Sequence, residues 1–71
     1  MTVSAKKLVR MAEQITANMN YGEASEIVAA KVADHINKFW DERMTLEFKV
    51  YAKNHTDEFS IELQAAIPLL D

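Results

Sequence analysis

The sequence predicts an all-α protein, a small bundle of three to four helices that forms a single domain over residues 1–71. Three observations predict this class. Apolar residues recur at steps of three and four along most of the chain, which is the spacing of one helical face. The chain has one glycine and one proline, so few positions interrupt a regular element. Its hydrophobic fraction is 49%, which is typical of a folded chain rather than a disordered one.

The first helix is expected to begin after Ser4, whose hydroxyl can accept a hydrogen bond from a backbone N–H of the first turn. Turn-forming residues at positions 18–22 should end it. One face of this helix is apolar and comprises Leu8, Met11, Ala12, Ile15 and Met19.

A second helix is expected over residues 23–39. Its apolar arc is wide enough to contact more than one neighbouring element. The arc comprises Val28, Ala29, Val32, Ala33, Ile36, Phe39 and Trp40.

Asp41 is a suitable N-cap for a third helix that starts at Glu42. Its inner face would comprise Met44, Phe48, Tyr51 and Ala52, whereas Leu46 and Val50 would point away from the core.

A loop is expected at residues 54–57, followed by a short last helix capped by Ser60. Pro68 should end that helix near Ile67, because proline lacks the N–H that a helix interior needs. The apolar stripe of this helix comprises Leu63, Ala66, Ile67 and Leu70.

The same half of the chain admits a different structure. Residues 44–51 and 59–64 alternate between apolar and polar side chains, and two such runs around a polar loop are typical of a β-hairpin. An isolated hairpin is only marginally stable in water, so this one would have to pack on the first two helices. The residues alone leave helix and hairpin both open.

Composition excludes several classes of site. The chain has no cysteine, which excludes disulfides, thiolate-bound zinc and iron–sulfur clusters. The net charge of −3 disfavours nucleic acid as a partner, because that affinity comes mainly from neutralised phosphates. No apolar run is long enough for a membrane span, and none follows Lys6, Lys7 and Arg10 as in a signal peptide. We therefore expect a cytoplasmic protein.

The sequence offers no catalytic residue, no cofactor-binding residue and no metal ligand set. His35 and His55 are too few and too far apart to predict a metal centre. A single glycine excludes a glycine-rich phosphate loop. On folding, a domain of this size buries only about 60% of the surface that its unfolded chain exposes. Its core therefore supplies only about 3–5 kcal/mol of net stability. We expect a non-enzymatic protein that gains stability from a protein partner or a second copy of itself.

Two runs of the sequence, residues 8–15 and 32–44, resemble the delta subunit of soluble NAD-dependent formate dehydrogenase. The resemblance covers about residues 7–44, a little over half of the chain. It implies a helical accessory subunit of a cytoplasmic oxidoreductase complex, without a redox centre of its own. The partner implied is the large subunit, which carries the molybdenum or tungsten centre and iron–sulfur clusters, and whose assembly or stability the delta subunit would support.

The second run supplies the candidate partner-binding residues. An apolar patch would be buried against the partner, with a carboxylate and a guanidinium fixing its orientation. Tryptophan and arginine are both common at binding hot spots. The candidates implied by the resemblance are Asp34, His35, Phe39, Trp40, Asp41, Arg43 and Met44.

The chain departs from the family pattern in two places. Glu42 stands where the family often has proline, and residues 45–56 match poorly. The family is helical over this stretch, which favours the helix over the hairpin. The alternative function is a free-standing, homo-oligomeric helical interaction protein. A helix-turn-helix nucleic-acid binder is disfavoured by the acidic charge balance.

Overall fold

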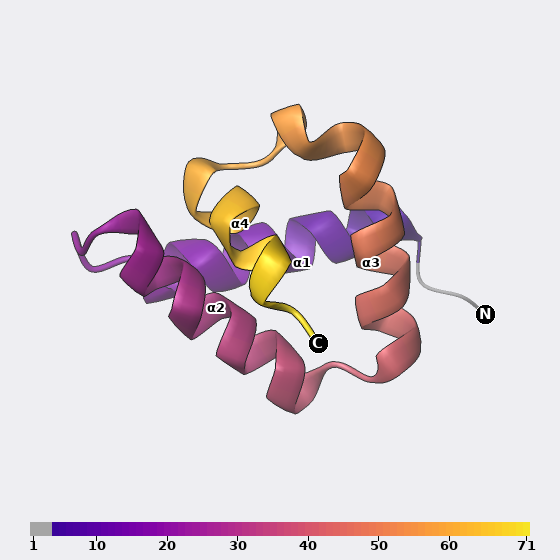
Figure 1. The fold of residues 1–71 in the computed structure, drawn as a ribbon, viewed down its shortest axis with the longest axis horizontal. Coiled ribbons are helices and arrows are strands. Elements are labelled where there is room, and N and C mark those ends of the chain that lie inside the picture. Colours follow the sequence, from indigo (N-terminus) through magenta and orange to yellow (C-terminus); the bar gives the residue numbers. More distant parts are fainter. Residues whose placement is uncertain (1–3) are drawn as a thin grey trace.

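Four α-helices make up most of the computed structural model, which describes residues 4–71 (Figure 1). No strand occurs among these residues, so the all-α prediction is confirmed and the hairpin alternative is wrong. The helices are α1 (Ala5–Met19), α2 (Ser25–Phe39), α3 (Glu42–His55) and α4 (Ile61–Ala66), with two 3₁₀ helices at Thr56–Glu58 and Ile67–Leu69.

Three of the four helices begin at side-chain caps, and all three caps are the predicted ones. The Ser4 hydroxyl accepts from the backbone N–H of Lys7 at 3.3 Å. The Asp41 carboxylate accepts from Met44 at 2.8 Å, and the Ser60 hydroxyl accepts from Leu63 at 3.3 Å. Each cap satisfies an N–H that has no partner within its helix.

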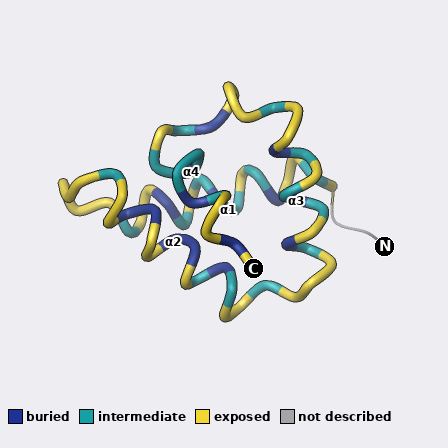
Figure 2. Tube along the Cα trace, in the orientation of Figure 1, coloured by how far each residue is buried: buried dark blue, intermediate teal, exposed yellow. Residues whose placement is uncertain are grey.

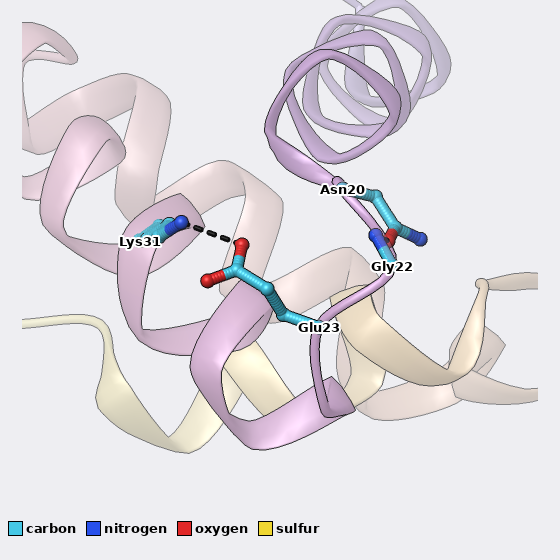
Figure 3. Close-up of polar contacts among 4 residues, drawn as sticks. All are labelled: Asn20, Gly22, Glu23 and Lys31. Atoms are coloured by element: carbon cyan, nitrogen blue, oxygen red, sulfur yellow. Dashed lines mark hydrogen bonds and ion pairs between the residues drawn. The ribbon is translucent and has the colours of Figure 1, made fainter.

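The connection from α1 to α2 is held by short-range polar contacts (Figure 3). Gly22 has φ of +84°, a conformation that L side chains rarely adopt, and its N–H donates to the Asn20 side chain at 3.1 Å. Glu23 forms an ion pair with Lys31 at 2.6 Å. Helix α2 begins at Ser25, two residues later than the sequence predicts, and no side chain caps its start.

The core lies where α2 and α4 pack against α1, with α3 closing one end (Figures 1 and 2). Several core positions are alanines, whose small side chains allow helix axes to approach closely. The buried apolar residues are Leu8, Ala12, Val28, Ala29, Val32, Ala33, Ile36, Phe48, Ala52, Phe59, Leu63, Ala66 and Leu70.

The loop expected at residues 54–57 is helical, so that prediction is wrong: α3 includes residues 54 and 55, and a 3₁₀ helix follows from Thr56. The Nδ1 atom of His55 lies 2.9 Å from the carbonyl oxygen of Tyr51, and the two rings stack with centroids 3.9 Å apart. The Thr56 hydroxyl donates to the carbonyl oxygen of Ala52. Side chains thus satisfy carbonyls of the last turn, and the 3₁₀ helix Thr56–Glu58 follows directly.

The end of the chain behaves as predicted. Helix α4 ends at Ala66, and Pro68 lies in the 3₁₀ helix that follows it. The Asn37 amide on α2 donates to the Leu69 carbonyl at 3.2 Å and accepts from the Asp71 N–H at 3.0 Å. Residues 69–71 are therefore held against α2, with Leu70 buried between the two contacts.

Candidate protein-docking surfaces

The seven candidate residues divide between an exposed groove on α2 and the corner where α2 meets α3. Asp34, His35 and Phe39 line a groove of about 440 Å³. Trp40 lines a different groove, of about 450 Å³, together with residues of α3. The structure therefore does not bring all the candidates together on one surface.

The first groove, here called the α2 groove, has exposed aromatic side chains at its rim. Phe39 is 72% exposed and Tyr21 is 79% exposed. Phe39 belongs to the wide apolar arc expected on the second helix, but it lies at the exposed edge of that arc and not in the core. Phe39 is the last residue of α2, and the chain turns away at Trp40 before another element can cover its ring. The groove is lined by Met19, Tyr21, Lys31, Asp34, His35, Lys38 and Phe39.

Two side-chain contacts lie along the α2 groove. The His35 ring lies against Phe39, with centroids 4.7 Å apart. Asp34 and Lys38 form an exposed ion pair at 3.0 Å, one helical turn apart. A pair of this kind stabilises a helix by only a few tenths of a kcal/mol. The pair therefore adds little to stability, and both charges remain accessible to a partner.

At the corner, three candidates have structural contacts of their own. Trp40 is half-buried, and its ring meets that of Phe48 edge-on at 5.7 Å. Met44 is half-buried against the core, and Asp41 caps α3. Arg43 is exposed, and it forms no ion pair with any other residue in the described range 4–71.

A second contact holds residues 69–71 over the groove at this corner. The Lys49 ammonium donates to the backbone carbonyl of Asp71 at 2.9 Å. The end of the described chain thus forms one wall of the groove that Trp40 lines, and we call this the corner groove. Its lining comprises Asn37, Trp40, Glu42, Thr45, Leu46, Lys49 and Asp71.

A third groove, on the outer side of α3, was not identified from the sequence as a site. The prediction that Leu46 and Val50 point away from the core is confirmed, since they are 61% and 55% exposed. With Ala5 of α1, and with Tyr51 and Glu47, they line a groove of about 350 Å³ that we call the α3 groove. The available signal was a pair of apolar residues one turn apart on the polar side of a helix.

One titratable group beside these grooves, the Tyr51 hydroxyl, has a shifted pKa. Partial burial, and then the charge of Glu58 and a hydrogen bond to it, raise the pKa of the Tyr51 hydroxyl above its usual 10.0. That bond to the Glu58 carboxylate is long, at 3.4 Å. Within residues 4–71, no three His, Asp or Glu side chains gather closely enough to hold a metal ion.

None of the helices in the described part of the chain has the length and apolar character needed to cross a membrane.

The fold and its surfaces define a small all-α protein that leaves large apolar side chains in exposed grooves. The chain matches the model of the family described as NADH-dependent formate dehydrogenase delta subunit FdsD, over residues 7–67. It therefore belongs to this family, and the match extends well beyond the two runs that carry the resemblance in the sequence. No curated protein and no solved structure matches the chain.

Proposed function

We propose that this protein is a non-catalytic accessory subunit that binds the large, metal-bearing subunit of NADH-dependent formate dehydrogenase and supports its assembly or stability. Family membership over residues 7–67 supports the assignment to this enzyme. The single observation that carries the binding role is the exposed aromatic rim of the α2 groove, formed by Phe39 and Tyr21. Large aromatic side chains exposed in a groove are typical of interaction sites in soluble proteins.

In this proposal the candidate residues have two different tasks. Asp34, His35 and Phe39 contact the partner directly through the α2 groove. Trp40 and Met44 pack beneath the corner and keep the end of α2 at a fixed angle to α3. Such a division is expected of an interface in which a few anchors carry the energy and neighbouring residues preserve the shape.

Charged residues at the corner fix the orientation in which the chain docks on its partner. Asp41 fixes the start of α3 by capping it, with its carboxylate 2.8 Å from the N–H of Met44. Arg43 projects from the first turn of α3 and is available to pair with a carboxylate of the partner. Guanidinium–carboxylate pairs are directional, so this contact would select one docking orientation.

The test is a binding titration of the purified chain with the large subunit, comparing Phe39→Ser with a matched control. Ile61→Ser is suitable, since Ile61 is 71% exposed against 72% for Phe39 and lies on α4. Complete burial of a phenylalanine side chain is worth about 1.5–3 kcal/mol, so Phe39→Ser should weaken the Kd about ten- to hundredfold. Ile61→Ser should leave the Kd within about twofold, because its surface is not part of the interface.

Two results would overturn the proposal. A wild-type chain that sediments alone as a tight oligomer, and does not bind the large subunit, would identify a free-standing oligomeric protein. Wild-type binding that Phe39→Ser leaves unchanged would remove the α2 groove from the interface. Formate-dependent NAD reduction by the enzyme complex, prepared with and without this chain, separates support of assembly from a passive contact.

A further inference from the structure

The outer face of α3 has an unusual composition. Arg43, Leu46, Val50 and Lys53 follow one another at steps of three, four and three. At about 100° per residue, the four side chains fall within an arc of roughly 80°. All four are exposed, and the arc lies on the side of the helix opposite the buried Phe48. An apolar pair with a cation at either end therefore runs along the solvent side of this helix.

The start of α1 completes this surface. Ala5 lines the α3 groove together with Leu46, Val50 and Tyr51, and Figure 1 shows the first turn of α1 beside α3. One carboxylate, that of Glu47, lies at the edge of the groove. The rest of the lining is apolar and comes from two helices, so an element bound there would contact both of them.

The charged residues around the α3 groove indicate what kind of structural element binds there. Helix α1 carries three cations against one carboxylate, and that carboxylate, Glu13, is already bonded to Ser60. Helix α3 carries three cations against two carboxylates. Residues 56–71 carry four carboxylates and no lysine or arginine. The α3 groove thus lies between the two positively charged helices of a chain whose net charge is −3.

The same charges argue against a second copy as the occupant. A symmetric dimer through this face would bring Arg43 and Lys53 of one copy close to the same residues of the other. Like charges held together at an interface oppose association. Neither cation forms an ion pair with another residue in the range 4–71, so both are available to a partner's carboxylates.

We propose that the α3 groove docks an amphipathic helical segment of the formate dehydrogenase large subunit, with apolar side chains on Leu46 and Val50 and flanking carboxylates facing Arg43 and Lys53. The identity of the partner rests on the proposed function, whereas the chemistry of the segment rests on the groove. This surface is distinct from the α2 groove, so the large subunit would hold the chain at two places.

The experiment measures binding of the whole chain to the purified large subunit for two double variants and one double-variant control. Leu46→Ser with Val50→Ser removes the apolar floor, and the matched control is Ile27→Ser with Ile61→Ser, two exposed apolar residues on α2 and α4. The floor variant should weaken the Kd about tenfold or more, and the control should stay within about twofold. Circular dichroism should show equal helix content for both proteins, because all four positions are exposed.

The second variant, Arg43→Gln with Lys53→Gln, tests the charge of the segment. It should lower the association rate about tenfold at low salt and flatten the decrease of that rate with ionic strength. Wild-type binding that both variants leave unchanged would refute the α3 groove and the pairing proposed for Arg43, and would leave the α2 groove as the remaining contact with the large subunit. A wild-type chain that does not bind the large subunit would refute both. If the chain forms a dimer that is lost only in the Leu46→Ser, Val50→Ser variant, a second copy of the chain occupies the groove.

Discussion

Glu13 is the side chain whose removal best tests how this small fold is held together. Its two carboxylate oxygens accept from one residue 47 positions away: Oε2 from the Ser60 N–H at 2.9 Å, and Oε1 from the Ser60 hydroxyl at 2.8 Å. The Ser60 hydroxyl in turn accepts from the N–H of Leu63. Glu13 therefore orients the residue that caps α4, and it ties that helix to α1.

The expected cost of Glu13→Ala follows from these contacts. Hydrogen bonds to a charged group are worth about 1.5–3 kcal/mol, and loss of an oriented N-cap costs about 0.5–2 kcal/mol. The contributions overlap, because the same serine makes both, and the site is half-buried. We expect Glu13→Ala to lower the free energy of unfolding by about 2–3 kcal/mol, roughly half of what a core of this size supplies.

The assay is urea unfolding followed by circular dichroism. Glu13→Gln keeps one amide oxygen as an acceptor but places an NH₂ group where the second donor points, so we expect an intermediate loss of about 1–2 kcal/mol. Glu26→Ala is the control, since this exposed carboxylate stabilises the start of α2 only through the helix dipole, by about 0.3–1 kcal/mol. A Glu13→Ala protein as stable as the Glu26→Ala protein would refute the role assigned to this link.

Two further predictions concern the aromatic side chains. Phe48→Ala should lower the free energy of unfolding by about 3–5 kcal/mol, because the ring is fully buried and stacks on that of Phe59 with centroids 5.6 Å apart. Trp40→Ala should lower it clearly less, because Trp40 is only half-buried. Urea unfolding that gives the reverse order would contradict the packing described. The raised pKa of Tyr51 means that the folded chain holds the hydroxyl proton more tightly than the unfolded chain, so stability should fall as the pH rises above about 10. Tyr51→Phe should lose less stability over that range, and an unchanged pH profile would show that this hydroxyl is not linked to folding.

The helix starts could be predicted from the sequence because capping is local chemistry. Ser4, Asp41 and Ser60 each need only a backbone N–H three residues later, and that spacing is visible in the sequence. The continuation of α3 through His55 could not be predicted in the same way. It depends on the stacking of His55 on Tyr51 and on a threonine hydroxyl that bonds back to a carbonyl, in a stretch of otherwise turn-forming residues.

For the candidate residues too, one part could be predicted from the sequence and another part depends on the fold. Their residue types pointed to a binding segment at positions 32–44, but which of them are exposed depends on where α2 ends relative to α3. Phe39 and Trp40 are adjacent aromatic residues, yet one is 72% exposed and the other packs on the buried ring of Phe48. A one-residue step along the last turn of a helix changes direction by about 100°, so the position of the turn decides which ring meets the core.

The strand-like alternation of residues 44–51 has a physical explanation in the structure. Met44 and Phe48 are one turn apart on the inner side of α3, whereas Leu46 and Val50 are one turn apart on the outer side. Interleaved, the two apolar pairs give a period of two, although each pair alone has the helical spacing. Polar residues at 46 and 50 would have left an ordinary amphipathic pattern. The ambiguity in the sequence therefore arises from the apolar residues that the fold leaves on the surface, which are those we propose to meet the partner. Local pattern and fold disagree most often at functional sites.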